Sequence, residues 1–180
     1  LSRPHMPFKG LIMAILISPM IVPLIITAAG MFFFYSKLGL THSYTGLILA
    51  HTALGTPFVV ITVTATLTGF DNNLIRASQS LGADTMRTFF KVIMPLILPG
   101  VISGALFAFI TSFDEVVVVL FVGSVEQVTI PRQMWAGLRQ EISPVILCMA
   151  TCLVALSIAL LTTVELLRRR SERLRGIKHR

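Results

Sequence analysis

Residues 10–35 of this chain read GLIMAILISPMIVPLIITAAGMFFFY, a run without a single formal charge. An α-helix needs about 20 apolar residues to cross the roughly 30 Å of hydrocarbon in a bilayer, so this run is long enough to span a membrane. Two prolines, Pro19 and Pro23, lie inside the run and are expected to bend the helix. The sequence therefore predicts a first membrane-spanning helix that is bent.

Three more apolar blocks follow and predict spans at about 44–70, 93–122 and 145–167. The whole chain of 180 residues is 54% hydrophobic and only 13% charged, which excludes a soluble globular enzyme. The net charge of +7 does not indicate nucleic-acid binding, because 7 of the 15 Lys and Arg residues lie in the last thirteen positions, beside the last apolar block. We expect an all-α, polytopic membrane protein in which residues 1–180 form a single transmembrane domain.

The distribution of basic residues predicts the orientation. Four spans place both ends on the same side, and twelve Lys and Arg residues lie on that side, in residues 1–9, 70–91 and 168–180. Only three lie in the opposite loops. Because basic residues favour the cytoplasmic side, both ends and the 70–91 segment are expected in the cytoplasm. The chain begins at Leu1, and its first apolar block is too long for the core of a signal peptide, so we expect a longer natural chain.

The segment between the second and third predicted spans, residues 71–95, reads DNNLIRASQSLGADTMRTFFKVIMP. Helical spacing of its apolar residues predicts a short surface helix that ends at Gly82, then a second helix leading to Pro95. Residues that can cap these two helices are Asp71, Asp84 and Thr85. A helix that carries Arg76 and Arg87 beside an apolar stripe is suited to docking on another protein; the alternative is an interfacial helix resting on lipid headgroups.

This segment resembles the EAA loop of the permease subunits of bacterial ATP-binding-cassette importers. The pattern of that loop is Glu-Ala-Ala, three residues, Gly, nine residues, Ile, one residue, Leu-Pro, and the spacing agrees throughout. The residue type is identical at Ala77, Gly82 and Pro95, and similar at Ser78, Val92 and Met94. Arg76 stands where the motif has glutamate, which reverses the charge at that position.

The resemblance implies the fold of a type I importer permease, usually with six spans, so about two more spans are expected before this chain. It also implies that the 71–95 loop contains a coupling helix that sits in a groove of a cytoplasmic ATPase. The residues expected in this contact are Arg76, Ala77, Ser78, Leu81, Gly82 and Ala83. The chain itself has no phosphate-binding loop of the Gly-rich, Lys-Ser or Lys-Thr type, so no enzymatic activity and no bound cofactor are expected.

The expected partners follow from the same resemblance. They are a second permease subunit, identical or different, two ATPases that bind ATP and Mg, and a periplasmic substrate-binding protein, all assembled at the bacterial inner membrane. No metal site and no catalytic residue are expected in this chain, because its four histidines are scattered and none belongs to a motif with an acid. The competing class, a carrier that works without ATP, would need inverted repeats or charges relayed along several spans.

Two acidic residues, Asp114 and Glu115, follow 22 uncharged residues and precede ten more, so they are expected within a span. An ionisable group there costs roughly 2.5–3.5 kcal/mol on insertion scales and is a candidate for function. One interpretation is a negative pair that lines the pathway and attracts a cationic substrate. The other is a helix break, in which Asp114 caps a second helical piece at 116–122 and Glu115 pairs with an arginine of a partner subunit.

The surroundings of Asp114 also resemble the polyamine branch of these permeases, which handles spermidine and putrescine. The matching phrases are Ser18-Pro19, Thr56-Pro57-Phe58-Val59-Val60 and Ser112-Phe113-Asp114-Glu115-Val116. The resemblance implies that the acid at Asp114 contacts the substrate. Met20 stands where some members have an acid, so a smaller amine or a zwitterion is an alternative substrate, as is an iron complex.

Three further features have more than one interpretation. Trp135 lies in a predicted short periplasmic helix and is either an interfacial anchor or a contact for substrate or binding protein. Small residues recur every fourth position at Gly100, Gly104, Ala108 and Ser112, which predicts close packing within the bundle or against the second subunit, or a lining of the pathway. His51 is either a hydrogen-bonded packing residue or a proton carrier, and the first is expected because no acid lies near it in sequence.

Overall fold

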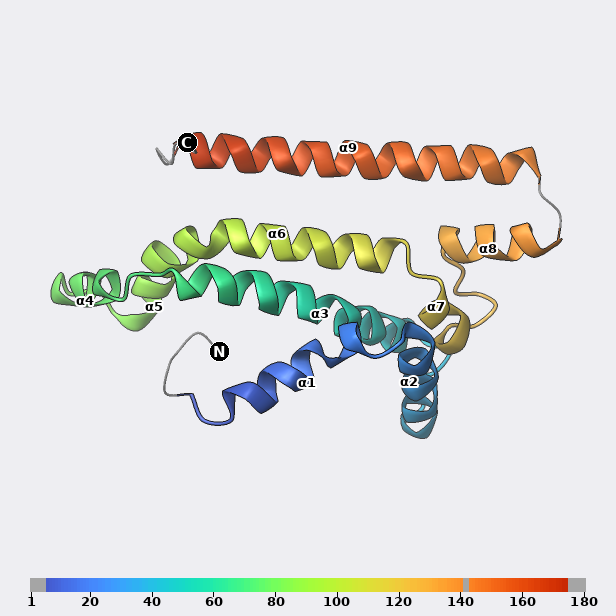
Figure 1. Ribbon diagram of the computed structural model, residues 1–180, viewed down its shortest axis with the longest axis horizontal. Helices are drawn as coiled ribbons and strands as arrows, with labels where there is room; N and C mark the ends of the chain where they lie inside the picture. Colours follow the sequence, from blue (N-terminus) through green and yellow to red (C-terminus); the bar gives the residue numbers. More distant parts are fainter. Residues whose placement is uncertain (1–5, 141–142, 175–180) are drawn as a thin grey trace.

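The computed structural model of the protein describes residues 6–140 and 143–174, and every regular element in these ranges is helical (Figure 1). The elements are α1 (Lys9–Ile21), α2 (Leu24–Leu38), α3 (Tyr44–Thr68), α4 (Asn73–Ser80), α5 (Thr85–Thr88), η1 (Phe89–Ile93), α6 (Met94–Phe113), α7 (Val117–Val122), α8 (Ile130–Gln140) and α9 (Pro144–Leu174).

Three of these helices are long and apolar enough to cross a membrane. They are α3, the run Thr85–Phe113 that joins α5, η1 and α6, and the Pro144–Thr163 part of α9. The helices α1 and α2 pass the same test together but are bent by 109°, so residues 6–140 and 143–174 contain three candidate spans, or four if this pair is one broken span. The expected all-α membrane fold is confirmed.

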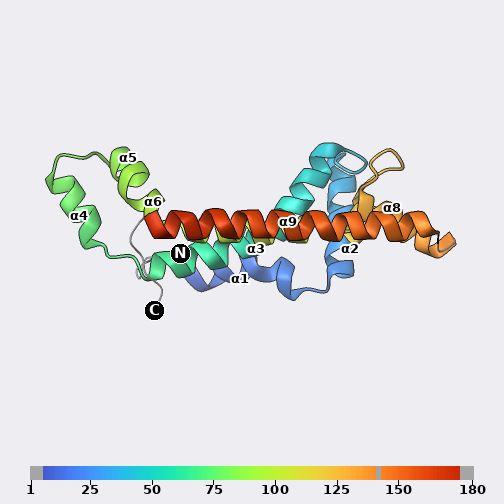
Figure 2. The same cartoon turned by 90° about the horizontal axis from the view of Figure 1, so that it is seen from above.

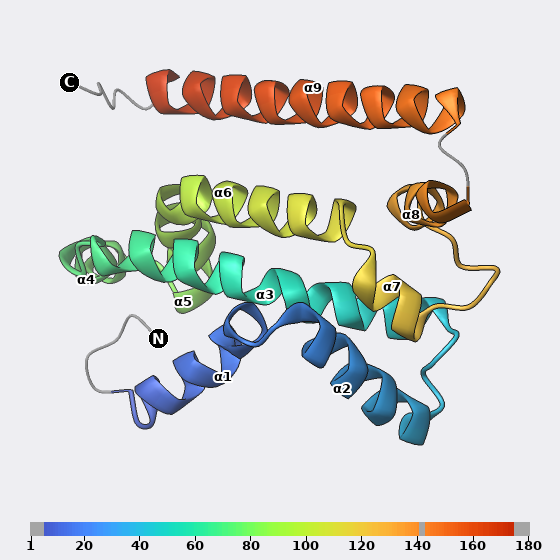
Figure 3. The same cartoon turned by 45° about the vertical axis from the view of Figure 1, so that its right-hand side comes forward.

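The bend between α1 and α2 falls at Val22 and Pro23. Proline disfavours the helical conformation of the residue before it, and Val22 is extended, with φ −73° and ψ 135°. A new helix starts at once, since the Pro23 carbonyl accepts from the N–H groups of Ile26 at 2.9 Å and Thr27 at 3.1 Å. Pro19 stays inside α1. A bend was expected, but a break of this size gives two short arms, with α1 against α3 and α2 against α7 (Figure 3).

The helices α3 and α6 lie side by side and form the centre of the structure (Figure 1). Glycines make their close approach possible: a Cβ atom added to Gly104 would lie 2.8 Å from the Cα atom of Val59, and one added to Gly55 would lie 2.9 Å from the Cβ atom of Ala108. The predicted close packing of the small-residue stripe is therefore confirmed, and its partner is α3 of the same chain.

The third predicted span differs from the observed helix. The helix begins earlier than residue 93, at Thr85, and ends at Phe113 rather than continuing to 122. Residues 117–122 form the separate helix α7, which packs against α2 and contributes the buried side chains Val118, Val119 and Val122. A single apolar block in the sequence is thus divided between two helices with different neighbours.

The two ends of the bundle differ in what they present. The helices α4 and α5 project at one end, where α1 begins and α9 ends, whereas α7 and α8 lie at the other (Figures 1 and 2). The helix α9 runs beside α6, but no residue of its most apolar stretch is buried in this chain. Its apolar surface is suited to lipid or to another subunit.

The glycine contact between α3 and α6 can be tested with one added methyl group. We expect Gly104→Ala to lower the melting temperature in detergent by roughly 2–12 °C, because the Val59 backbone has to move and such overpacking costs about 1–3 kcal/mol. Gly30→Ala is the control, since a Cβ atom there meets no atom within 4 Å. Equal melting temperatures for Gly104→Ala and the unsubstituted chain would show that α3 and α6 do not pack this closely.

Candidate functional site

The turn between α4 and α5 is built around Gly82. Its φ is +81°, in the left-handed region that glycine adopts most easily. The Ala83 N–H donates to the Ser78 carbonyl at 3.1 Å and the Gly82 N–H donates to the Gln79 carbonyl at 3.0 Å, which is the hydrogen-bond pattern of a Schellman motif. The predicted helix end at Gly82 is confirmed, and the glycine is needed for its backbone conformation, not for lack of space.

The second helix of the loop is capped by Asp84. The Arg87 N–H donates to Oδ1 of Asp84 at 2.6 Å, so Asp84 rather than Thr85 is the N-cap. The Asp71 side chain accepts from the Asn73 N–H at 2.9 Å, although the N-cap position of α4 itself falls at Asn72. Both helices of the loop therefore start with carboxylate contacts that fix the path of the chain.

A buried hydrogen bond ties the two helices of the loop together. Oγ of Ser78 and Oγ1 of Thr88 lie 2.6 Å apart, and the Thr88 side chain is 2% exposed. Ser78 thus faces α5 rather than the surroundings. The other residues expected to contact an ATPase are exposed, apart from the half-buried Ala83; these exposed residues are Arg76, Ala77, Leu81 and Gly82.

Large apolar side chains stand on the outside of this loop. Leu81, next to the glycine turn, is 89% exposed, and Met86 and Phe90 are also exposed. We call these three side chains the loop patch.

The loop continues into α6 without a break. Pro95 has no N–H to donate, and the backbone passes it with a π-helical turn at Phe89–Ile93, in which the Met94 N–H donates to the Phe89 carbonyl.

Glu115 is a buried helix cap. Both of its carboxylate oxygens lie 2.9 Å from the Val118 N–H, and Oε2 also accepts from the Val119 N–H at 3.2 Å. The Glu115 side chain is 5% exposed. Since the first N–H groups of a helix need acceptors and hydrocarbon offers none, this carboxylate allows α7 to begin inside the protein. The expectation that Asp114 caps this helix is wrong.

Asp114 has a different environment from its neighbour. It is exposed and ends α6, where its N–H donates to the Ile110 carbonyl at 3.2 Å. Its side chain lines a small cavity of about 120 Å³ between α6 and α9, together with Phe113 and Ser157. The two acids are therefore not a pair: Glu115 is occupied by backbone groups, and Asp114 faces a cavity.

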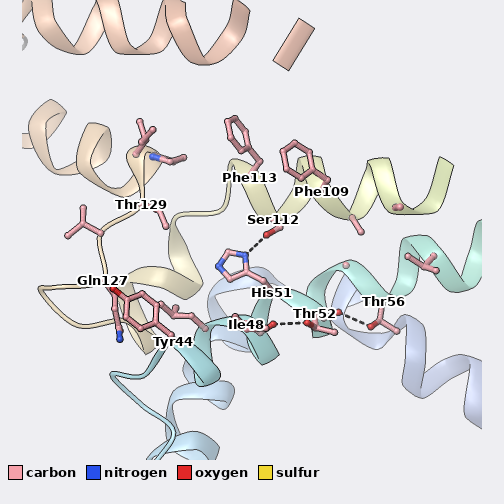
Figure 4. Close-up of a pocket in the computed structure, with 18 of the residues that line it drawn as sticks. Tyr44, Ile48, His51, Thr52, Thr56, Phe109, Ser112, Phe113, Gln127 and Thr129 are labelled. Carbon is pink, nitrogen blue, oxygen red and sulfur yellow. Dashed lines mark hydrogen bonds between the residues drawn. The ribbon is translucent and has the colours of Figure 1, made fainter. Parts of the chain in front are cut away.

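A much larger cavity, of about 1020 Å³, lies between α3, α6 and residues 126–131 (Figure 4). His51 and Ser112 both line this cavity, and Nδ1 of His51 lies 2.8 Å from Oγ of Ser112. The expected hydrogen bond of His51 is therefore confirmed. Among the described residues that line this cavity, Glu126 is the one with a carboxylate. Nothing in the sequence pointed to Glu126, because an acid in a loop ordinarily faces water.

The connection between α7 and α8 is braced from both sides. Nε2 of Gln127 donates to the His42 carbonyl at 3.1 Å, and Nη1 of Arg132 donates to the carbonyls of Ser124 at 2.6 Å and Gln127 at 3.0 Å. These bonds fix the wall of the large cavity. Trp135, on α8, is 50% exposed and is not among the residues that line either cavity.

The fold and the site together define a polytopic helical membrane protein with a structured helical loop between two spans. Residues 2–173 match the family of the binding-protein-dependent transport system inner membrane component, and the chain belongs to this family. The family consists of multi-pass transport permeases, which are not enzymes.

Several individual relatives are permease proteins of spermidine or putrescine transport systems. The chain is 31% identical to the spermidine/putrescine transport system permease protein PotC of Haemophilus influenzae over 163 residues, covering 91% of the chain and 62% of the relative. It is also 31% identical to PotC of Escherichia coli, over 91% of the chain and 61% of the relative. The putrescine transport system permease protein PotI of Escherichia coli is 32% identical over 59% of the chain and 38% of its own length. The chain thus spans about three fifths of the PotC relatives.

The cap formed by Glu115 predicts a specific order of stability among variants. We expect Glu115→Ala to destabilise the protein by about 1–3 kcal/mol, because it leaves the Val118 and Val119 N–H groups without this acceptor. Glu115→Gln keeps an oxygen acceptor and should lose clearly less. Thermal unfolding of the purified protein in detergent measures both. Equal losses for the two variants would contradict the cap, because glutamine keeps an oxygen that can accept from the Val118 N–H.

Proposed function

We propose that this chain is a permease subunit of an ATP-driven importer, that it forms half of a translocation pathway for a small cationic amine such as spermidine or putrescine, and that it couples to a cytoplasmic ATPase through residues 71–95. Membership of the binding-protein-dependent transport family supports the importer, and the PotC and PotI relatives support the amine. The shape of the loop supports the coupling.

The single observation that carries the proposal is the α4–Gly82–α5 element. It projects from the end of the long helices, its two helices are joined by the buried Ser78–Thr88 bond, and it exposes the loop patch. A rigid element with an apolar tip can enter a groove on another protein and transmit a displacement to α6, with which it is continuous. In this proposal ATP and Mg bind to the ATPase, and their binding and hydrolysis shift the permease between two states.

We place the α4–α5 end in the cytoplasm and the α7–α8 end in the periplasm. The excess of Lys and Arg in residues 1–9, 70–91 and 168–180 supports this orientation. The first helix begins and the last helix ends at the α4–α5 end, as the charge distribution requires. The remaining proposed partners are a second permease subunit, for which the uncovered apolar side of α9 is available, and a periplasmic binding protein at the α7–α8 end.

The coupling role predicts that ATPase binding depends on the backbone at Gly82. We expect Gly82→Val to reduce copurification of the ATPase with the assembled importer at least tenfold, because a β-branched residue is strongly disfavoured at φ +81° and the turn has to change. Gly82→Asn is the matched control, since asparagine tolerates this conformation, and it should retain the ATPase.

Quantitative copurification from membranes that contain equal amounts of each permease variant measures this effect. Full retention of the ATPase by Gly82→Val would contradict the coupling role of the loop.

We further propose that Asp114 contacts the cationic substrate as it passes. Its carboxylate is exposed at the point where α6 ends, and an acid at this depth is costly unless a cation or water meets it. Glu115 is not included in this role, because its carboxylate already accepts from α7.

Asp114→Asn tests this role. We expect it to lower uptake of radiolabelled putrescine by reconstituted importer at least tenfold, because the amide keeps the shape of the side chain but removes the negative charge. Asp114→Glu should retain measurable uptake, and the amount of assembled complex should be the same for both. Unchanged uptake by Asp114→Asn would remove Asp114 from the pathway.

A further inference from the structure

The large cavity and Asp114 lie on different sides of α6. Ser112 faces α3 and lines the cavity of about 1020 Å³, whereas Asp114 lines the small cavity beside α9. The two cavities share Phe109 and Phe113, but the large cavity is otherwise lined by Glu126 and by residues of α3, whereas the small cavity is lined by Asp114 and by residues of α9. The kind of ligand that the large cavity can bind depends on the residues that line it.

Glu126 lines this cavity, and its backbone belongs to a braced turn. The Glu126 N–H donates to Oγ of Ser124 at 3.2 Å, and the Ser124 N–H donates to Oε1 of Gln127 at 3.1 Å. Arg132, the nearest cation in this turn, is occupied by the carbonyls of Ser124 and Gln127. Within the described part of the chain, no ion pair neutralises Glu126. The turn thus presents a free negative charge to the cavity.

The opposite wall of the cavity contains two hydroxyl oxygens that can only accept hydrogen bonds. The hydroxyl groups of Thr52 and Thr56 donate to carbonyls of their own helix, Thr52 to Ile48 and Thr56 to Thr52, both at 2.7 Å (Figure 4). Their protons are used in these bonds, so the lone pairs that remain on each oxygen can only accept. A ligand that donates hydrogen bonds is favoured at this wall.

The lining also contains polar residues such as His51, Ser112 and Gln127, but much of the rest is apolar and partly aromatic. Val59 and Ile48 come from α3, and Phe109 and Phe113 come from α6, where their rings stack with centroids 5.4 Å apart. Such a surface suits methylene groups, and ring faces tolerate a nearby ammonium group. One carboxylate at the edge, hydroxyl acceptors inside and apolar walls between them match a molecule with a cationic end, a methylene chain and a second donor.

We propose that this cavity binds an alkyl diamine or polyamine, with one ammonium group at the Glu126 carboxylate, the methylene chain along Val59 and Phe109, and the second amine at the hydroxyl oxygens of Thr52 and Thr56. This proposal rests on the proposed function, because it adds a binding site to the amine pathway. The site extends from residues 126–131 to Val59 and Val60, in the second half of α3. Glu126 therefore acts as a specificity residue distinct from Asp114.

Uptake kinetics of the complete reconstituted importer test the charge. We expect Glu126→Gln to raise the KM for putrescine at least tenfold with little change in the maximal rate, and Glu126→Asp to raise it less. Thr56→Val should also raise the KM, because it removes an acceptor from the cavity. Thr68→Val is the matched control: Thr68 makes the same bond to its own helix, to the Thr64 carbonyl at 2.8 Å, but does not line the cavity.

Protection from labelling provides a readout that does not depend on transport. In a background in which Cys148 and Cys152 are replaced by serine, Thr56→Cys in the assembled importer should react with a small maleimide, and putrescine should slow this reaction. The uncharged 1,4-butanediol should not. No reaction in the absence of putrescine would show that protein covers the cavity, and equal protection by the diol would show that charge is not recognised; either result overturns the proposal.

The outcomes separate this proposal from the proposed function. If Asp114→Asn abolishes putrescine uptake while Glu126→Gln and Thr56→Val leave the KM unchanged, the cavity site is wrong and the importer function stands. If the importer retains its ATPase but takes up neither putrescine nor spermidine, the amine assignment and the cavity site fall together, and the coupling role remains.

Discussion

The constraint on which this structure depends is that backbone N–H and C=O groups cannot be left without partners in hydrocarbon. Each irregularity in the long helices meets this constraint in a different way. The carbonyl of Pro23 accepts from the first turn of α2, the π-turn at Phe89–Ile93 carries the helix past Pro95, and the Glu115 carboxylate supplies the first N–H groups of α7. At each of these positions a helix bends, begins or changes its hydrogen-bond pattern.

The same constraint explains why the two neighbouring acids behave differently. A break in the third span exposes the start of a new helix, and only the side chain directed toward α7 can supply it, so Glu115 is buried. Asp114 is then free to face the gap beside α9. An apparent negative pair in the sequence is thus one structural acid and one available acid. Keeping an ionised group in a membrane costs free energy. Hydrogen bonds from the α7 backbone offset this cost for Glu115, whereas Asp114 is exposed and lies at a cavity.

Much of the fold could be predicted from the sequence, because length, hydropathy and the glycine at position 82 are local signals. Tertiary contacts decided the rest. The Ser78–Thr88 bond joins residues from two helices whose relative angle depends on the Gly82 turn. The wall of the cavity at Glu126 depends on the bond from Gln127 to the distant His42 carbonyl and on the bonds from Arg132 to carbonyls of its own loop. The division between Asp114 and Glu115 also depends on which way the chain turns after Phe113, and adjacent residues of the same charge give no indication of that.

The packing of α3 against α6 limits how a signal can travel through the molecule. The loop helix α5 is continuous with α6, and Gly104 and Gly55 bring α3 so close to α6 that the two cannot slide without clashes between backbone atoms. A push on the loop therefore moves α3 and α6 as one body. The wall of the large cavity at residues 126–131 is attached to the α2–α3 connection by the bond from Gln127 to the His42 carbonyl, and the His42 N–H in turn donates to the Val122 carbonyl of α7 at 2.8 Å. Because His42 lies two residues before the start of α3, this bond holds the Gln127 end of the wall in place relative to the α3–α6 pair.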